Sequence, residues 1–433
     1  MDPRALLIES FEAAVAAADP ARVLAAHLPD HREIAGYRRT LVVGAGKAAA
    51  SMAAALEAHW PADASLEGLV VTRYGHGMDC RRIDVIEAGH PVPDSAGEEA
   101  ARTILASCAQ LGDSDLLVVL VSGGASSLLA LPVDTVPMDD LKALTQALLA
   151  SGAPIQDMNV VRKHLSMIQG GRLAQATRAR VLALVISDVA GDDISAIGSG
   201  PCAPDPSTYE DALAVLRRYR VDPPASIAEH LRRGAAGAIG ETPKPGDAFF
   251  ARVENRVIAS AAASLAAAAQ CFAAAGVRPV VLGDTITGEA RDVAQVHAAI
   301  AAELDVRGER SFGPGFKRPL ALISGGECTV TLGGAGGGRG GRCCEFLLAL
   351  AVAAPEQGLW AIAADTDGID GSETNAGAVL SPDARERARA LGVEAGRCLE
   401  AHDSYRFFES TGDLLVTGPT RTNVNDYRAL LLP

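Results

Sequence analysis

Basic residues stand inside or beside glycine-rich stretches at several places in this chain. The longest stretch has seven glycines in the nine residues 333–341, with Arg339 inside it and Arg342 directly after it. Glycine lets main-chain N–H groups approach a ligand closely, and arginine adds a fixed charge with fork geometry. The stretch leads into an expected helix at Cys343, where N–H groups without helical partners favour anions. It therefore predicts a phosphate or carboxylate site.

A second glycine turn carries a lysine. Gly44, Gly46 and Lys47 follow the apolar run 40–43 directly and precede an alanine-rich segment. A lysine in such a strand-to-helix turn is suited to hold a phosphoryl oxygen, yet the G-x-G-x-x-A spacing also matches the dinucleotide-binding fingerprint. The acidic residue that should close the next strand is missing, because that strand runs into Arg73, which could accept an NADP 2′-phosphate. Phosphoryl transfer and NAD(P)-dependent redox chemistry both stay open.

Polar loops follow the other apolar runs. Two runs end in Ser-Gly-Gly, at residues 122–124 and 324–326, and carboxylates follow two more, in 188–193 and 365–370. A kinase requires positive groups around the transferred phosphoryl group, carboxylates for magnesium, and a group that orients the attacking hydroxyl. These loops could supply all three. The third hypothesis is a non-catalytic protein that binds a phosphosugar. Binding alone would require fewer charged loops than this sequence contains.

A predicted helix places Asn159, Arg162 and Lys163 at positions i, i+3 and i+4. Residues at this spacing share one face, so the face is basic and suits a carboxylate or a phosphate. The alternative is an ordinary solvated face. The full set predicted to bind substrate or phosphate is Gly44, Gly46, Ser122, Gly123, Gly124, Ser126, Asn159, Arg162, Lys163, Ser324, Gly325, Gly326, Glu327 and Arg339.

The apolar runs themselves predict the fold. Each run is followed by a polar glycine loop and a helical stretch, which is typical of parallel sheets with helices on both faces. We expect an α/β protein with two Rossmann-like α/β/α domains, mainly parallel sheets and an interdomain cleft, with ligands at the carboxyl ends of the strands. Glycines and two prolines in 234–247 predict the boundary, with domains at 1–237 and 238–433.

Composition limits the partners and the compartment. The net charge of −14 over 433 residues disfavours nucleic acid and anionic membranes as partners. The eight cysteines form no C-x-x-C pair, so we expect reduced thiols and a cytoplasmic protein. The protein could form a homodimer.

The motifs together resemble the ATP-dependent glycerate 2-kinase family, whose C-terminal half is known as the MOFRL domain. The resemblance runs from about residue 5 to the end and rests, in this order, on VVGAGKAA, EAGHPVPDSAG, VSGGASSLL, NVVRKHLSMIQGGRLA, ISDVAGDDISAIGSGP, ISGGECTVTL, TDGIDG and TGPTRTNVND. It implies transfer of the ATP γ-phosphoryl group to the 2-hydroxyl of D-glycerate, giving 2-phospho-D-glycerate, with Mg²⁺ as cofactor. Some members are labelled hydroxypyruvate reductase, which is the redox alternative again.

The resemblance also implies residue roles. Lys47, Arg342 and Asp367 fall on the positions proposed for catalysis, and Asp188 on a candidate acid or metal ligand. Asp188, Asp367 and Asp370 are the candidate magnesium ligands.

The chain departs from the family pattern at a few positions. Cys343 and Cys344 replace an Asn-Gln pair, while Arg421 and Asp365 replace glycines. At a helix start, the two thiols are expected to have a lowered pKa.

Overall fold

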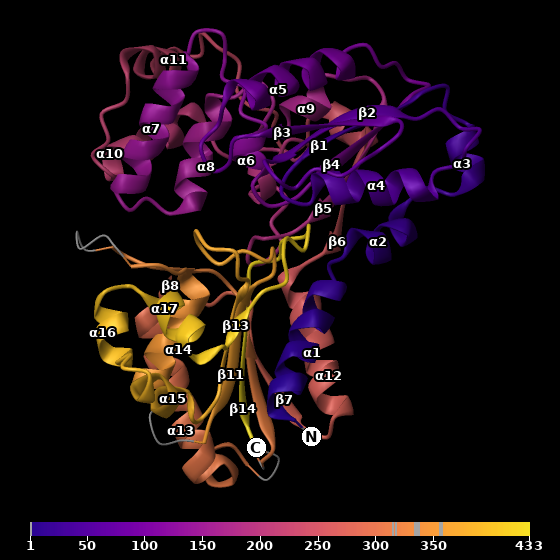
Figure 1. Cartoon of the computed structure of the whole chain (residues 1–433). Helices are drawn as coiled ribbons and strands as arrows, with labels where there is room; N and C mark the ends of the chain where they lie inside the picture. The colour runs from indigo at the N-terminus through magenta and orange to yellow at the C-terminus, as the bar shows by residue number, and fades with distance from the viewer. Residues whose placement is uncertain (1, 314–315, 317, 333–337, 355–357) are drawn as a thin grey trace. The chain divides into compact units, whose positions relative to one another are not determined.

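The computed structural model describes residues 2–313, 316, 318–332, 338–354 and 358–433. The chain forms two compact units, unit 1 (Met1–Arg22 and Ala259–Pro433) and unit 2 (Val23–Ile258). Figure 1 shows the elements of both. Residues 333–337 of the glycine-rich stretch lie outside the described residues.

Unit 2 is built on a six-stranded sheet in the order β3-β2-β1-β4-β5-β6, the strand order of dinucleotide-binding Rossmann folds. Its strands are β1 (Thr40–Ala45), β2 (Glu67–Arg73), β3 (Ile83–Ala88), β4 (Leu116–Val121), β5 (Arg180–Ile186) and β6 (Val253–Ala259). The pairings of β1 with β2 and β4, of β2 with β3, and of β4 with β5 are parallel. All residues of β1 and β4 are buried, as their continuous apolar runs predict. The Rossmann-like prediction is confirmed for this unit.

The helices of unit 2 cover this sheet and form one further group. They are η1 (Leu24–His27), α3 (His31–Ala35), α4 (Ala49–His59), α5 (Ser95–Cys108), α6 (Ala125–Leu128), α7 (Met138–Ala150), α8 (Ile155–His164), α9 (Arg172–Gln175), η2 (Ile197–Ser199), α10 (Tyr209–Arg218), α11 (Ala225–Ala235) and η3 (Ala248–Arg252), with α2 (Pro20–Val23) at the unit boundary. Helices α7, α8, α10 and α11 lie together (Figure 1) around a separate apolar cluster that includes Leu144, Met158 and Tyr209.

Unit 1 corrects the prediction of mainly parallel sheets. Its six-stranded sheet has the order β13-β12-β11-β14-β9-β7. The strands are β7 (Arg278–Gly283), β9 (Leu320–Ser324), β11 (Trp360–Asp365), β12 (Gly377–Leu380), β13 (Leu414–Leu415) and β14 (Asp426–Leu432), and a separate small sheet pairs β8 (Gly288–Glu289) with β10 (Cys328–Thr329). Among these described strands of the larger sheet, β7 and β9 pair parallel, whereas β14 runs antiparallel to both β9 and β11, and β12 antiparallel to both its neighbours.

The reason lies in the connections. A parallel crossover usually needs a helix, and no helix stands between β11 and β12 or between β13 and β14 in the described chain. Continuous apolar runs report burial on both faces of a sheet but not strand direction.

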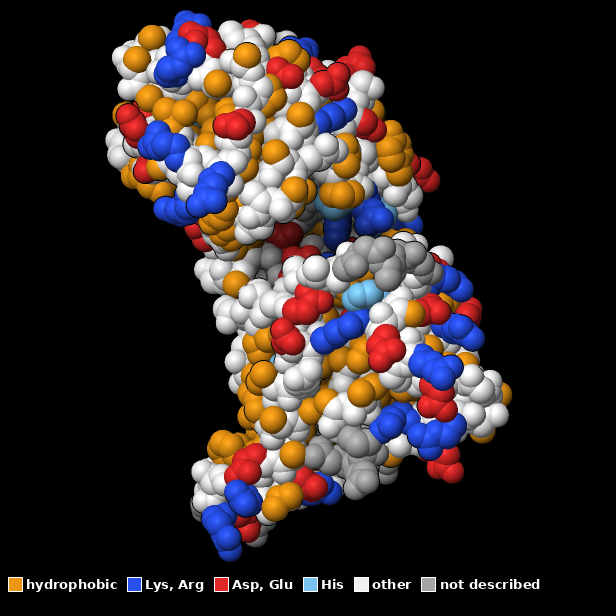
Figure 2. All heavy atoms as spheres, turned by 90° about the vertical axis from the view of Figure 1, so that its left-hand side faces the viewer, with side chains coloured by type: hydrophobic (Ala, Val, Ile, Leu, Met, Phe, Trp, Pro, Cys, Tyr) orange, Lys and Arg blue, Asp and Glu red, His pale blue; other side chains and the backbone are white. Residues whose placement is uncertain are grey.

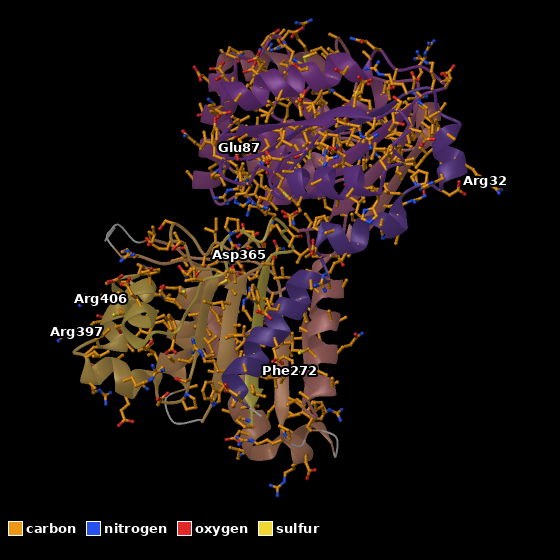
Figure 3. All side chains as sticks on the ribbon, turned by 45° about the vertical axis from the view of Figure 1, so that its right-hand side comes forward. Arg32, Glu87, Phe272, Asp365, Arg397 and Arg406 are labelled. Carbon is orange, nitrogen blue, oxygen red and sulfur yellow. The ribbon has the colours of Figure 1, made fainter. Side chains whose placement is uncertain are left out.

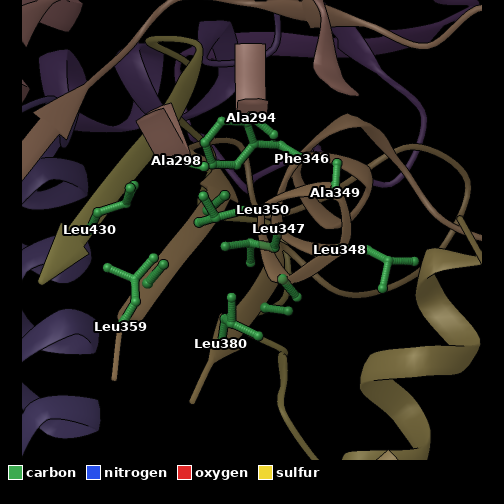
Figure 4. Packing of buried hydrophobic residues seen from close by; sticks show 14 of the residues in the cluster. Ala294, Ala298, Phe346, Leu347, Leu348, Ala349, Leu350, Leu359, Leu380 and Leu430 are labelled. Atoms are coloured by element: carbon green, nitrogen blue, oxygen red, sulfur yellow. The ribbon is translucent and has the colours of Figure 1, made fainter. Parts of the chain in front are cut away.

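Two helical layers cover the sheet of unit 1 (Figure 1). Helices α1 (Pro3–Ala16) and α12 (Ala261–Ala274) lie on one face, where Phe272, labelled in Figure 3, shares a core with Leu7 and Phe11. The other face carries α13 (Ala290–Phe312), α14 (Arg342–Ala353), α15 (Ala384–Ala390), α16 (Ala395–Glu400) and α17 (Ser404–Thr411). Figure 4 shows Phe346 and Leu350 of α14 packed with Ala294 and Ala298 of α13. The two faces therefore have separate apolar cores.

The units divide the chain at other points than the predicted boundary of 237 and 238. The stretch 234–247 belongs to unit 2, because Asp205 fastens it: the Asp205 N–H donates to the Pro243 carbonyl at 2.8 Å and the Thr242 hydroxyl donates to the Asp205 carboxylate at 3.0 Å. Strand β6 then completes the sheet of unit 2, and α1 packs in unit 1. A glycine- and proline-rich composition therefore marked a fastened loop rather than a linker.

Acidic and basic side chains are interspersed over the face shown in Figure 2. The eight cysteines are free thiols. Within the described chain, no helix combines the length and the apolar character needed to cross a bilayer.

Candidate functional site

The turn after β1 is fastened to the loop after β4, at the point where the strand order of unit 2 reverses. The N–H of Lys47 donates to the Gly123 carbonyl at 2.8 Å, and the N–H of Ala48 donates to the Ser122 hydroxyl at 3.0 Å. The N–H of Gly46 donates to the Val71 carbonyl at 3.1 Å. Ligands of open α/β sheets bind at such switch points. The predicted Gly44–Lys47 and Ser122–Gly124 motifs are therefore brought together.

The glycines of this turn serve close packing. A Cβ on Gly44 would lie 2.1 Å from the Leu120 carbonyl oxygen, and one on Gly46 would lie 2.1 Å from the Ser122 hydroxyl. Gly46 also has a φ of +136°, which few other residues adopt. The N–H groups of Gly46, Lys47 and Ala48 all donate to acceptors within the protein. These three groups are therefore not available to bind a dinucleotide pyrophosphate.

The side chain of Lys47 runs past Gly124. A Cβ on Gly124, whose φ is +84°, would lie 3.6 Å from Lys47 Cγ and 2.8 Å from His90 Nε2. Only glycine leaves room here for both side chains. Lys47 is thus presented beside the Ser-Gly-Gly loop, and Asp188 follows β5 in the same sheet.

Ser126 and Asn159 hold the loop that follows β5. The hydroxyls of Ser126 and Ser199 lie 2.8 Å apart, and the Ser199 hydroxyl donates to the Asn159 side-chain oxygen at 3.0 Å. Ser199 adopts a φ of +59°, a strained conformation for serine. The structure thus gives Asn159 a positioning contact, whereas the sequence predicts a ligand contact.

The predicted basic face of α8 is divided by what packs against it. Lys163 Nζ lies 3.6 Å from Asp205 Oδ1, and both side chains are buried. Arg162 points elsewhere, into a recess that Ser126 and Ser127 also line. Burial lowers the pKa of Arg162, and no carboxylate pairs with it among the described contacts. Lys163 is therefore a structural cation, and Arg162 is the one of the two that faces a recess.

Arg342 of unit 1 lies within three carboxylates. Its Nε, Nη2 and Nη1 atoms contact Asp426 at 2.8 Å, Asp365 at 2.6 Å and Glu327 at 2.8 Å. Burial alone would lower the pKa of Arg342, but the charges of Asp426, Asp365 and Glu327 outweigh it and raise this pKa well above its usual range. Asp426 was not among the predicted site residues, although it is the last residue of the TGPTRTNVND motif.

The second Ser-Gly-Gly loop, Ser324–Gly326, is also fastened internally. The fully buried Arg428 donates to the carbonyls of Gly325 at 3.3 Å and Gly326 at 3.0 Å, and it pairs with Asp426 at 3.2 Å. The Ser324 hydroxyl lies 3.0 Å from His297 Nε2. The likeness of the two Ser-Gly-Gly motifs therefore does not extend to their contacts.

At the N-terminus of α14, the carboxylate of Asp370 takes the place expected for a bound anion. The two carboxylate oxygens of Asp370 accept the N–H groups of Cys343 at 2.9 Å and Cys344 at 2.8 Å. Burial raises the pKa of Asp370 to about 6, although both hydrogen bonds act to lower it. Both oxygens of Asp370, a predicted magnesium ligand, therefore accept main-chain N–H groups of the helix in this structure.

The prediction of reactive thiols at this helix start is wrong. Burial and the charges of Asp370 and Asp426 raise the pKa of Cys343 well above its usual range, and burial and Asp370 do the same to Cys344. Both thiols are fully enclosed in the core. They replace amides as packing groups.

Asp367 lies in the loop after β11, close to Asp365, which Figure 3 labels. The N–H of Asp367 donates to Asp365 at 3.0 Å, and Asp367 in turn accepts the N–H of Ile369 at 2.9 Å. Gly368 is needed here, because a Cβ would lie 2.1 Å from the Gly418 carbonyl. Among the residues with described positions, no three His, Cys, Asp or Glu side chains form a metal cage.

The described end of the glycine-rich stretch packs against neighbouring loops. A Cβ on Gly338 would lie 2.2 Å from the His402 carbonyl, and one on Gly341 would lie 2.2 Å from Asp370. Arg339 pairs with Glu373 at 2.8 Å and stacks over Tyr405, with 4.2 Å from its guanidinium carbon to the ring centre. In this structure Arg339 therefore makes surface contacts.

Known proteins are similar to this chain over nearly its full length. The "Domain of unknown function (DUF4147)" model matches residues 6–232, and the "MOFRL family" model matches residues 320–426. A protein of Agrobacterium vitis that is provisionally named a hydroxypyruvate reductase is 49% identical over 99% of this chain and 94% of its own. The glycerate 2-kinase of Pyrococcus horikoshii is 37% identical over 98% of this chain and 96% of its own.

A solved structure has the same fold. The crystal structure of glycerate kinase from Thermotoga maritima has a TM-score of 0.84 and 35% identity, and the match covers 99% of both chains. With both domain models in order and relatives matched from end to end, the chain belongs to the glycerate 2-kinase family that combines a DUF4147 domain with a MOFRL domain.

Proposed function

We propose that this protein is an ATP-dependent glycerate 2-kinase. In the reaction, the 2-hydroxyl oxygen of D-glycerate bonds to the γ-phosphorus of ATP, the bond from that phosphorus to the β,γ-bridging oxygen breaks, and the hydroxyl proton is released. The products are 2-phospho-D-glycerate and ADP. The names of full-length relatives, including those from Pyrococcus horikoshii and Thermotoga maritima, support this substrate pair.

The observation that carries the proposal is the closed turn after β1. A reductase would need this turn to bind the pyrophosphate of a nicotinamide cofactor through its N–H groups. These groups instead donate to Val71, Gly123 and Ser122. The turn thereby loses the dinucleotide function but still presents the ammonium of Lys47 at the carboxyl end of the sheet.

Lys47 then serves as the phosphoryl clamp. An ammonium at the switch point meets negative charge that spreads over the γ-phosphoryl oxygens during transfer, and such preorganised charge is the main catalytic term in kinases. Arg342, at the start of α14, and Asp367, in the loop after β11, are proposed for the same reaction by their motif positions. Arg342 is already held by Asp426, Asp365 and Glu327, so these acids fix the orientation of its guanidinium.

Magnesium fits this chain as an ion that arrives with ATP. Mg²⁺ keeps waters and takes one or two carboxylates together with substrate phosphates, so it needs no all-protein cage. Asp188, Asp367 and Asp370 are the acids proposed as its ligands by their motif positions, although the Asp370 oxygens already accept two N–H groups of α14. Such an ion neutralises phosphate charge. The free thiols accord with a cytoplasmic enzyme.

The test is a coupled assay on purified protein that measures ADP release. We expect ADP only when D-glycerate, ATP and a divalent cation are all present. Robust NADPH oxidation with hydroxypyruvate, without ADP release, would refute the kinase and establish the reductase.

A further inference from the structure

A recess in unit 2 collects basic side chains without acidic ones. Its polar lining includes Ser126, Ser127, Lys142, Thr145, Arg162 and Gln169, and no Asp or Glu lines it. Acidic residues outnumber basic ones in this chain, with 53 against 39. Two cations without a lining carboxylate are therefore a local reversal of the charge balance, which favours an anionic occupant.

Several polar groups of the recess already donate within the protein, whereas no acceptor is described for its two cations. The hydroxyl of Ser127 already donates to the Gly124 carbonyl at 3.1 Å, and that of Thr145 donates to the Leu141 carbonyl at 2.9 Å. The amide of Gln169 donates to the Ser126 carbonyl at 2.8 Å. Arg162 and Lys142 have no protein acceptor among the described contacts. An occupant that only accepts hydrogen bonds suits this lining.

The recess adjoins the Lys47 turn through one short loop. Ser126 and Ser127 line the recess, and Gly124, just before them, packs against Lys47 and His90. Pro91, which follows His90, also lines the recess. An anion on Arg162 would therefore lie close to the group proposed to hold the transferred phosphoryl.

We propose that Arg162, with Lys142 as a second cation, binds the carboxylate of the acceptor acid and so selects 2-hydroxy acids over neutral alcohols. A guanidinium fork matches a carboxylate bidentately. Apolar walls that include Leu131 and Leu141 would strengthen this pairing by excluding water. The assignment rests on the proposed function and adds the residues that recognise the acceptor.

The test compares KM values for D-glycerate and for ATP in Arg162→Gln, Arg162→Lys and Lys142→Gln. Arg178→Gln is the matched control, because Arg178 is an exposed arginine of unit 2, with 78% of its side chain accessible. We expect Arg162→Gln to raise the KM for D-glycerate about 100-fold, with the KM for ATP nearly unchanged, because a charged hydrogen-bond pair is lost. Arg162→Lys should recover only part of this loss, and Lys142→Gln should raise the same KM about tenfold. Thermal unfolding confirms that each variant is folded.

Calorimetric titration of D-glycerate and of glycerol, both without nucleotide, separates this inference from the kinase proposal. Wild-type protein should bind D-glycerate and not glycerol, and Arg162→Gln should lose that binding. If ADP assays fail but this binding pattern holds, the kinase proposal falls and the carboxylate site stands. If the kinase is active but Arg162→Gln raises the KM for ATP, or changes neither KM, the carboxylate assignment is overturned.

Discussion

The main-chain N–H of Lys47 donates to the carbonyl oxygen of Gly123 at 2.8 Å, which ties the turn after β1 to the loop after β4. This single bond fixes where the lysine leaves the backbone. Gly124 then lets its side chain pass, since any Cβ there would meet His90. Backbone contacts thus fix the point from which the proposed phosphoryl clamp extends.

Lys47→Ala should lower kcat/KM for D-glycerate phosphorylation by at least about 100-fold, or ~2.7 kcal/mol, the usual cost of removing one preorganised group that stabilises transition-state charge. Thermal stability should change little, because the turn is held by main-chain bonds that survive the substitution. Lys47→Arg should rescue poorly, since a planar fork does not replace a compact ammonium. Near-normal turnover in Lys47→Ala would transfer the clamp role to another cation.

Substitutions of the two neighbouring cations of α8 should affect stability differently. Lys163→Met leaves the buried Asp205 without its cation and should lower the free energy of unfolding by about 3–5 kcal/mol. Arg162→Gln removes a charge that has no carboxylate partner among the described residues, so stability should be kept. Urea unfolding of the two variants checks this. Equal stability in both would mean that the Lys163–Asp205 pair contributes nothing.

Helix α8 also shows which features of the site could be predicted from the sequence. The i, i+3, i+4 spacing correctly places the residues on a helix, because that information is local. It does not reveal what packs opposite, and Asp205 comes from a loop far along the chain. The glycine turn at Lys47 was predictable for the same reason, since strand, turn and helix follow one another directly.

The misreadings of unit 1 have a related cause. Strand β14 enters the sheet between β9 and β11 from the end of the chain, and apolar content does not encode direction. The helix start at Cys343 was correctly predicted, but its N–H groups are occupied by Asp370 through a tertiary contact. Local patterns therefore located elements and candidate residues, and long-range partners decided which of those residues face a ligand.

Alkylation of the native protein with iodoacetamide at neutral pH should leave Cys343 and Cys344 unmodified. Both are enclosed, and burial and nearby carboxylates raise the pKa of each thiol. Cys271 and Cys80 are the partly accessible thiols and should react first, although slowly, since burial raises the pKa of Cys80 to about 11. Peptide mass spectrometry gives the order. Early labelling of Cys343 or Cys344 would contradict the assigned core position.

Asp370 should make stability depend on pH between about 4 and 6. Its pKa rises from 3.8 to about 6 on folding, so the folded state keeps a proton that the unfolded state has lost. The free energy of unfolding should therefore fall as pH rises through this window, by on the order of 2–3 kcal/mol. Asp370→Asn should lack this slope. Urea titrations of both proteins at several pH values test it, and parallel profiles would refute the buried-acid assignment.

The proposed function depends on transfer of a phosphoryl group to the 2-hydroxyl of D-glycerate. ³¹P nuclear magnetic resonance of a reaction with Mg²⁺, ATP and D-glycerate tests it most directly, because coupling to the C2 proton identifies the phosphorylated position. We expect one 2-phosphoglycerate for each ADP formed. A phosphate on the 3-hydroxyl, or unchanged ATP while hydroxypyruvate oxidises NADPH, would contradict it.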